Sequence, residues 1–126
     1  MRVFCDEQGV TPEEELDGLD DDALHLLALD ESGVIATCRL RIPDGECKLE
    51  RMVVKERLRG LGVGAKLLAA AEDEARARGA AAIVLNAQVR VQDFYASQGY
   101  RPEGEHFTEA RIEHVRMRKP LDVESA

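Results

Sequence analysis

The stretch that most constrains this chain is residues 50–68, ERMVVKERLRGLGVGAKLL, which passes from an apolar strand pattern through a basic, glycine-rich turn into a helix pattern. Where a strand leads into the first turn of a helix, free backbone N–H groups and the positive end of the helix dipole converge. Glycine lets a phosphate approach these groups closely. The stretch therefore predicts an anion site, and the surrounding sequence must indicate which anion.

Two nucleotide-binding motifs come close to this turn. Gly60 to Ala65 fits the dinucleotide pattern G-x-G-x-x-G/A, but that pattern belongs to a βαβ unit with an acidic residue about 20 residues further on. Here an antiparallel strand pattern precedes the turn, and too little chain follows it for a full doubly wound sheet. The P-loop pattern requires glycine and a hydroxyl where this chain has Ala65 and Leu67. Neither motif agrees with its context.

Composition predicts one soluble domain. A chain of 126 residues, 44% of them apolar and 33% charged, suits a single globular unit over 1–126. It has no apolar run of membrane-spanning length and no signal-peptide pattern at its start, so we expect a cytoplasmic protein. The net charge of −8 disfavours binding to nucleic acid or an anionic membrane. Cys5, Cys38 and Cys47 lack metal-ligand spacing, which indicates reduced thiols and no metal site.

The hydrophobic pattern predicts an antiparallel meander followed by alternating helices and strands. Strands are expected over 23–29, 33–42, 48–54, 81–85, 100–103 and 112–117, and helices from Gly62 to a stop at Gly79 and over 91–97, before Gly99. Residues 4–22 show little periodicity, so a short helix or irregular start and an exposed acidic loop are expected there. The order implies an α+β fold, a mixed sheet with helices packed on it.

Two motifs narrow the fold further. The first is Arg59-x-x-Gly62-x-Gly64 at the strand–helix junction, and the second is FYASQGY at residues 94–100. Together they resemble the pyrophosphate loop [RQ]-x-x-G-x-[GA] and the FYxxxGF signature of the GNAT superfamily of acyl-CoA-dependent N-acyltransferases. The segments VFCDEQGV, ELDGLDDDALHLLA, ERMVV, NAQ and EGEHFTEARIEHVRM are similar, in this order, to the ElaA-like branch. The resemblance implies the GNAT fold, a mostly antiparallel twisted sheet flanked by helices.

The chain departs from that branch in three places. Such proteins normally begin with a further strand and the start of a helix ahead of the VFxxEQ segment, and Met1 lies inside this region. The chain is then a fragment, starts at a misplaced position, or covers that sheet edge with another element. Asn86 and Glu113 stand where relatives often have histidine and proline, which affects the acceptor side. By analogy with relatives, we expect a homodimer.

The resemblance implies acetyl-CoA as the acyl donor. Backbone amides of the glycine turn would bind the CoA pyrophosphate, with charge added by Arg57 and Arg59 and less by Lys66, whereas a plain solvated basic turn is the alternative. The preceding strand would splay from its parallel neighbour and pair its backbone with pantetheine. The residues assigned to the donor are Met52, Val53, Val54, Arg57, Arg59, Gly60, Leu61, Gly62, Val63, Gly64 and Ala65.

The family pattern also implies candidates for the chemistry. Tyr95 matches the tyrosine near the CoA sulfur, where a phenol can protonate the departing thiolate, although it could simply pack the helix on the sheet. Glu50 is the first candidate for the general base, with a plain strand-end acid as the alternative. His25, Gln88 and His114 are candidates to line the acceptor pocket, and either histidine could equally be a core imidazole.

These residues predict an acetyl-CoA-dependent N-acetyltransferase that acts by direct transfer on a primary amine of a small molecule or of a protein or peptide. A regulatory module that binds acyl-CoA without turnover is the alternative, and a nucleotide-binding protein is a third. The sequence does not identify the amine acceptor.

Overall fold

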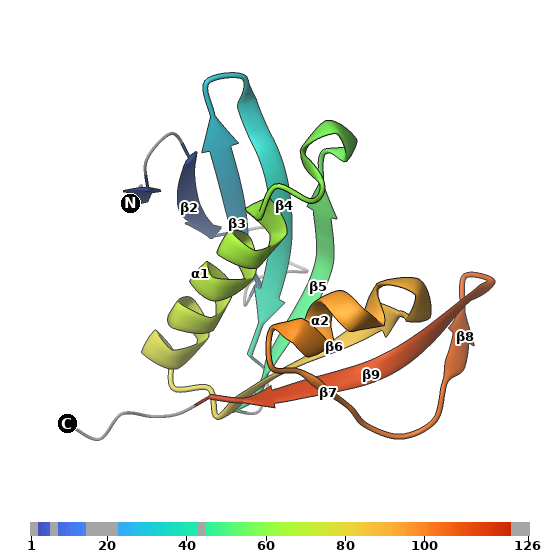
Figure 1. Ribbon diagram of the computed structural model, residues 1–126. Helices are drawn as coiled ribbons and strands as arrows, with labels where there is room; N and C mark the ends of the chain where they lie inside the picture. The colour runs from blue at the N-terminus through green and yellow to red at the C-terminus, as the bar shows by residue number, and fades with distance from the viewer. Residues whose placement is uncertain (1–2, 6–7, 15–22, 43–44, 122–126) are drawn as a thin grey trace.

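The computed structural model describes residues 3–5, 8–14, 23–42 and 45–121, with only the backbone described up to residue 14 (Figure 1). Within these ranges nine strands form one sheet in the order β1-β2-β3-β4-β5-β6-β9-β7, and β8 pairs with β9. The strands are β1 (Val3–Cys5), β2 (Gln8–Glu14), β3 (Ala23–Asp30), β4 (Gly33–Arg41), β5 (Cys47–Val54), β6 (Ala82–Gln88), β7 (Arg101–Pro102), β8 (Phe107–Glu109) and β9 (Ile112–Pro120). The helices are α1 (Val63–Ala77) and α2 (Gln92–Ser97), with short 3-10 turns at η1 (Glu56–Leu58) and η2 (Val89–Val91). Every strand pair is antiparallel except β5 with β6, so the predicted mixed, mostly antiparallel sheet is confirmed.

The start of the chain differs from its prediction. Where a short helix or irregular segment was expected, β1 and β2 extend the sheet, and β2 pairs along its length with β3, from Gly9 opposite Leu29 to Glu14 opposite Leu24. The strand pattern of this segment is weak because its backbone is fixed by pairing with a distant strand, not by local periodicity. The expected acidic loop over 15–22 lies outside the described residues.

Helix α1 forms where the apolar spacing predicted it. Leu67, Leu68, Ala71 and Ala75 recur three or four residues apart, and all are buried against the sheet. Burying each leucine contributes about 2 kcal/mol. At the other end Gly79 has a φ of 81°, which is the left-handed conformation that ends the helix.

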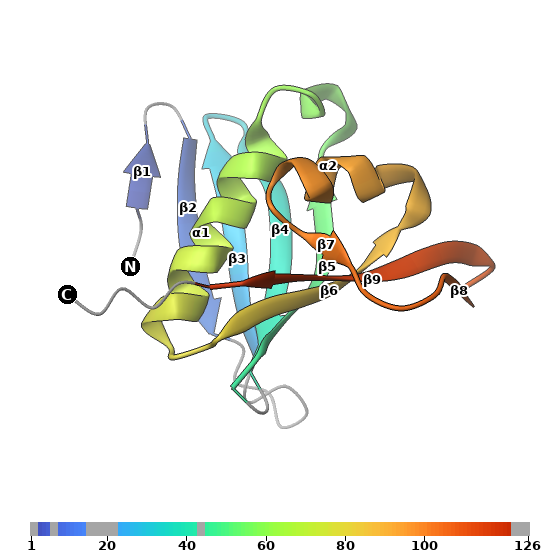
Figure 2. The same cartoon turned by 60° about the horizontal axis from the view of Figure 1, so that its bottom comes forward.

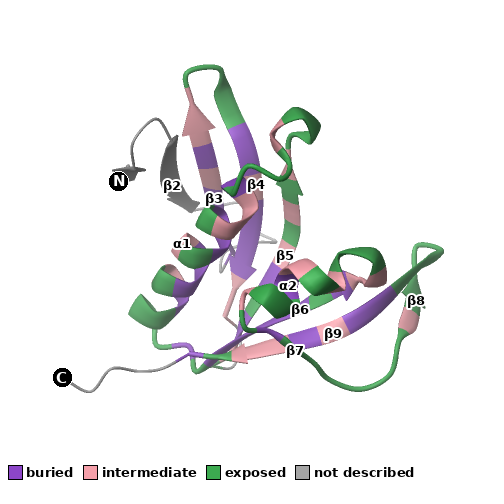
Figure 3. Ribbon diagram, in the orientation of Figure 1, coloured by how far each residue is buried: buried purple, intermediate pink, exposed green. Residues whose placement is uncertain are grey.

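Both helices cover the same face of the sheet (Figures 1 and 2). The core lies between that face and α1, and includes Leu26, Leu40, Leu67, Ile83 and Met117. Burial is accordingly concentrated along the strands behind the helices, while the loops and the outer sides of α1 and α2 are exposed (Figure 3). We call this side the helix face and the other side of the sheet the open face.

Strands β5 and β6 form a fork at the centre of the sheet. Their parallel pairing covers Cys47–Ile83, Lys48–Val84 and Leu49–Leu85. Beyond these pairs β5 continues toward the top of the view in Figure 1, whereas β6 runs to the right with β9. The second halves of the two strands are therefore not paired with each other, and Glu50 to Val54 form the β5 side of the fork.

Two further expectations concern membranes and cysteines. Neither helix of the described chain has the length and apolar composition required to span a bilayer. Cys38 and Cys47 are buried free thiols, as predicted, and the side chain of Cys5 lies outside the described residues.

Candidate functional site

A β-bulge lies on the β5 side of the fork. Thr37 pairs with Val53 and Arg39 with Glu50, so the single residue Cys38 on β4 lies opposite two residues of β5. One of these, Arg51, has a φ of 54°, in the left-handed region that non-glycine residues rarely adopt. Such bulges change the direction of a strand and redirect its side chains. Here the bulge comes directly after Glu50 and at the point where β5 leaves β6.

Tyr95 lies at this fork because α2 ends at a fixed point. Gly99 has a φ of 95°, the Gly99 N–H donates to the carbonyl of Ala96 (3.1 Å), and the Tyr100 N–H donates to the carbonyl of Tyr95 (3.1 Å). This is the Schellman arrangement, in which a hydrophobic contact accompanies the two hydrogen bonds. The contact is between the rings of Tyr95 and Tyr100, whose centroids are 6.0 Å apart. The spacing in FYASQGY thus fixes Tyr95 relative to the end of its helix.

The Tyr95 phenol contacts β5 in the part that diverges from β6. Its O–H donates to Met52 Sδ at 3.6 Å, and the residue is 9% exposed. Burial raises the pKa of this phenol to about 12. The group is therefore a phenol that holds its proton at neutral pH, in contact with Met52, the second of the two β5 residues in the bulge.

The glycine turn leads directly into the first turn of α1. Gly60 and Gly62 both have a φ of 84°, and Gly62 caps α1 without a side chain. The first bond of the helix runs from the Lys66 N–H to the Gly62 carbonyl (3.1 Å), so the N–H groups of residues 63–65 have no intrahelical acceptor. These three N–H groups lie at the positive end of a 15-residue helix, and the first turn of that helix lies beside the end of β5, since a Cβ at Gly64 would meet Val54 Cγ2 at 3.7 Å.

The basic side chains around the turn are held differently. Arg57 Nη2 donates to Ser32 Oγ (3.0 Å) in the β3–β4 turn, away from the start of the helix. Arg59 Nε donates to the carbonyl of Val54 (3.2 Å) at the end of β5. Since Lys55 pairs through its N–H with Ile35 on β4 (2.9 Å), the preceding carbonyl of Val54 points to the other edge of β5, toward the fork.

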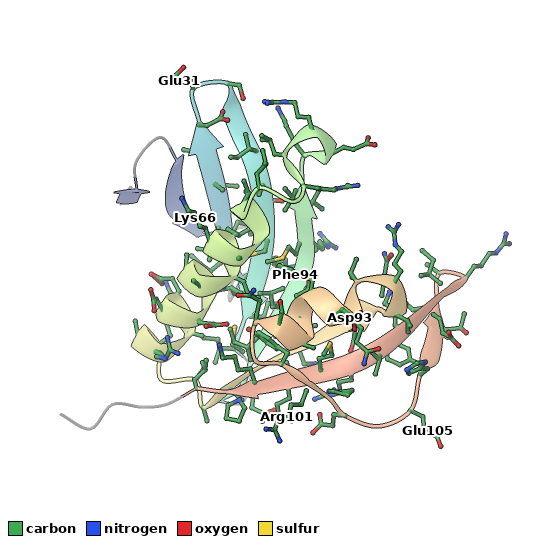
Figure 4. All side chains as sticks on the ribbon, viewed as in Figure 1. Glu31, Lys66, Asp93, Phe94, Arg101 and Glu105 are labelled. Carbon is green, nitrogen blue, oxygen red and sulfur yellow. The ribbon has the colours of Figure 1, made fainter. Side chains whose placement is uncertain are left out.

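Gly64 lies on the inner side of the first turn of α1. A methyl group at its Cα would meet Phe94 Cζ at 3.4 Å and Val54 Cγ2 at 3.7 Å. Figure 4 places Phe94 on the side of α2 that faces the start of α1, and Lys66 on the exposed side of α1. The absence of a side chain at Gly64 therefore allows α1, α2 and β5 to lie close together. The Gly64 N–H is one of the three N–H groups without an intrahelical acceptor.

Glu50 is paired with an arginine. Its Oε1 accepts hydrogen bonds from Arg41 Nε (2.9 Å) and Arg41 Nη2 (2.6 Å). Both side chains are half-exposed. Both belong to the open face, because Arg41 follows Leu40 and Glu50 follows Leu49, and these two leucines are register partners buried in the core on the helix face. Glu50 and Tyr95 thus approach the fork from opposite faces of the sheet.

The three predicted acceptor residues do not form one group. Gln88 and His114 are register partners at the ends of β6 and β9. The ring of His114 is buried and stacked on Phe107, with its Nδ1 2.8 Å from the carbonyl of Ile112 and its Nε2 3.8 Å from Glu109 Oε2. Gln88 Oε1 accepts from Arg90 Nε (2.8 Å). His25 lies on β3, where it pairs with Arg39, and β4, β5 and β6 separate it from β9.

Some residues that shape the site carry no pattern in the sequence. For Arg41, the partner of Glu50, the sequence pattern indicates only an outward-facing position on a strand. Arg51 gives no indication of a bulge because it is neither glycine nor asparagine. Hydrophobic periodicity places Glu72 on the solvent side of α1, yet it is 8% exposed. Only the distant partners of these residues account for their positions.

The fold and this fork define an acyl-CoA N-acyltransferase, and three comparisons agree. The sequence matches the family model described as an acetyltransferase (GNAT) domain over residues 2–121. It is 39% identical over 118 residues to YjcF, an uncharacterised N-acetyltransferase of Bacillus subtilis, covering 93% of this chain and 84% of that protein. The crystal structure of Escherichia coli ElaA superposes with a TM-score of 0.72 at 28% identity over 86% of this chain and 77% of that one.

The likeness extends to a structure with a bound ligand. The aminoglycoside 6′-N-acetyltransferase complexed with coenzyme A has the same fold, with a TM-score of 0.73 at 17% identity, over 82% of this chain and 76% of that one. The chain therefore belongs to the GNAT acetyltransferase family, and its relatives include ElaA. The resemblance stated from the sequence is confirmed, as are the fold class and the class of enzyme.

Proposed function

We propose that this enzyme transfers the acetyl group of acetyl-CoA directly to a primary amine of a small molecule or of a protein or peptide, with Tyr95 as the general acid. The observation that carries the proposal is the contact of the Tyr95 O–H with Met52 Sδ at 3.6 Å. It joins the phenol to β5 two residues before the end of the strand that leads into the glycine turn. One strand thus connects an anion site with a proton donor.

The donor would lie along β5. The pyrophosphate would accept hydrogen bonds from the N–H groups of residues 63–65, where the helix dipole also favours negative charge. Pantetheine would pair with the edge of β5 that no longer faces β6, along Met52 to Val54. The complex of coenzyme A with the aminoglycoside acetyltransferase of this fold supports the choice of donor. Arg59 would have to leave the Val54 carbonyl if pantetheine used that acceptor.

The proton would move from the phenol to the sulfur of CoA. The amine nitrogen attacks the thioester carbon, the C–S bond breaks, and the thiolate takes the proton of Tyr95. A phenol with a pKa near 12 still carries its proton at neutral pH and is available as the donor when the thiolate forms.

Glu50 would act on the acceptor from the open face. The amine must lose a proton to attack, and a carboxylate can take it directly or through water. Arg41 holds Glu50 Oε1 with two hydrogen bonds, which fixes the orientation of the carboxylate. Gln88 and His114 share the open face with Glu50 and are the residues we assign to the acceptor, with His25 further along the same face.

The first experiment measures CoA release from acetyl-CoA with a panel of primary amines: lysine, spermidine, an aminoglycoside and a lysine-containing peptide. We expect Tyr95→Phe to lower kcat at least tenfold with the best of these amines. The thermal shift produced by acetyl-CoA should stay the same, because the phenol does not contribute to the anion site. Unchanged turnover in Tyr95→Phe would remove the general acid. Acetyl-CoA binding without turnover of any amine would favour the non-catalytic module.

A further inference from the structure

A buried polar cluster joins the end of α2 to α1 and β9. Tyr100 Oη donates to Glu72 Oε2 (3.1 Å), and Lys119 Nζ donates to Glu72 Oε1 (3.0 Å) and to the carbonyl of Gln98 (2.9 Å). The Glu72 side chain is 10% exposed and that of Lys119 26%. We call Glu72, Tyr100 and Lys119 the α2 anchor. None of the three belongs to the donor or acceptor sites proposed above.

The geometry of the anchor bears on one residue of the proposed chemistry. Gln98 is the C-cap residue of α2, directly before Gly99, and its carbonyl accepts a hydrogen bond from Lys119 of β9. Tyr100 follows Gly99, and its hydroxyl is held by Glu72 of α1. The end of the helix is therefore fixed on both sides of the glycine. Gly99 itself is close to Lys119, since a Cβ there would meet Lys119 Cε at 3.2 Å.

Burying the charged groups of the anchor has a desolvation cost, which argues for a role beyond filling space. A buried carboxylate must be paired and hydrogen-bonded to offset its desolvation, and an apolar replacement of similar volume is often no less stable. Glu72 meets this requirement with two partners on two different elements, Tyr100 and Lys119. Hydrogen bonds of defined direction fix the relative position of the elements they join, which apolar contact does less strictly.

We infer that the α2 anchor is a positioning device that fixes the Tyr95 phenol at the fork between β5 and β6. The inference rests on the role proposed for Tyr95. The path is short: the anchor holds Gln98 and Tyr100, the Schellman bonds tie Tyr100 to Tyr95, and the ring of Tyr100 packs edge-on against that of Tyr95. Without the anchor, α2 could shift on the sheet and move the phenol away from Met52.

The composition of the chain offers a direct measurement of Tyr95. The sequence holds two tyrosines and no tryptophan, so Tyr95 is the sole tyrosine emitter in a Tyr100→Phe background. This background lacks the hydrogen bond from Tyr100 to Glu72 and keeps the two bonds of Lys119, so it tests the Lys119 part of the anchor. In that background we expect Lys119→Met to raise the constant for acrylamide quenching of Tyr95 at least twofold. Lys119→Arg, which keeps the charge and the donors, should restore it. Lys48→Met removes an exposed lysine from β5 and serves as the matched control.

Kinetics supply the second measurement. Lys119→Met alone should lower kcat at least fivefold with KM for acetyl-CoA within twofold, and it should have no further effect in a Tyr95→Phe background. If Lys119→Met leaves too little folded protein, Glu72→Gln combined with Lys119→Met removes both buried charges and takes its place. An unchanged quenching constant, or an equal loss of kcat in both backgrounds, overturns the inference. If Tyr95→Phe alone leaves turnover unchanged, the general acid fails separately, and quenching still decides whether the anchor holds the ring.

Discussion

Replacing Gly62 with alanine is the sharpest test of the glycine turn. Gly62 caps α1 with a φ of 84°, in the left-handed region, and within the described ranges no atom beyond its chain neighbours lies within 4 Å of where a Cβ would stand. The substitution therefore causes no clash, and its cost is backbone strain alone. That strain is about 1 kcal/mol for a residue with a Cβ, which in a domain of this size lowers Tm by about 4 °C.

Gly64→Ala, two residues further along the chain, is the matched control. Gly64 does not have a positive φ. A Cβ at this position would contact Val54 Cγ2 at 3.7 Å and Phe94 Cζ at 3.4 Å, and both distances are within ordinary van der Waals contact. Inside a helix alanine is favoured over glycine by about 1 kcal/mol. The new methyl group would face α2 and β5 and so leave the N–H groups of the first turn accessible. We expect stability to be equal or higher and acetyl-CoA binding to be within twofold of the parent.

Thermal melts with and without acetyl-CoA separate the two variants. Gly62→Ala should melt about 4 °C lower and lose most of the stabilisation by acetyl-CoA, because strain at the cap turns the N–H groups of residues 63–65 away from a common point. Gly64→Ala should keep both properties. Two variants that lose acetyl-CoA binding equally would contradict the argument, since the site would then depend on the absence of a side chain and not on the left-handed turn.

Two further predictions concern Tyr95 and Arg41. Burial raises the folded-state pKa of Tyr95 to about 12 from an unfolded value near 10, so the stability linked to this proton is present below pH 10 and is lost as the pH rises through 12. The difference between the two pKa values corresponds to about 3 kcal/mol in the free energy of unfolding. Guanidinium unfolding at a series of pH values should show that this free energy falls less steeply above pH 10 for Tyr95→Phe than for the parent. Parallel pH curves for the two proteins would refute the prediction. Arg41→Met should lower kcat/KM for the amine at least fivefold by releasing Glu50, yet shift Tm by less than about 4 °C because the pair is half-exposed; unchanged kcat/KM would leave Glu50 without an oriented role.

Local patterns predicted the central part of the fold. The spacing of Leu67, Leu68 and Ala71 predicts the buried side of α1, and Gly79 ends that helix because the left-handed conformation is a property of the glycine itself. The same holds for α2 and Gly99. The meander of β3, β4 and β5 follows from short apolar runs bounded by turns. In each case the residues that form the element also contain the signal for it.

Long-range pairing accounts for what the sequence did not predict. Strand β2 exists through its partner β3, and the short strand β8 through β9. Arg51 bulges because the register of β4 and β5 changes by one residue, which no property of arginine indicates. Glu72 is buried only because Tyr100 and Lys119 reach it from elements far along the chain. These are facts about contacts between segments, which periodicity within a segment does not contain.

The helix stop at Gly99 implies a constraint on length as well as on residue type. Tyr95 takes part in the helix stop because it lies four positions before Gly99, where Tyr100 can both donate to its carbonyl and pack against its ring. Each residue of an α-helix turns the chain by about 100°. An insertion of one residue between Tyr95 and Gly99 would keep all the residues of the motif. It would nevertheless rotate the phenol about a quarter of a turn away from β5. In α2, the interval between tyrosine and glycine is itself part of the site.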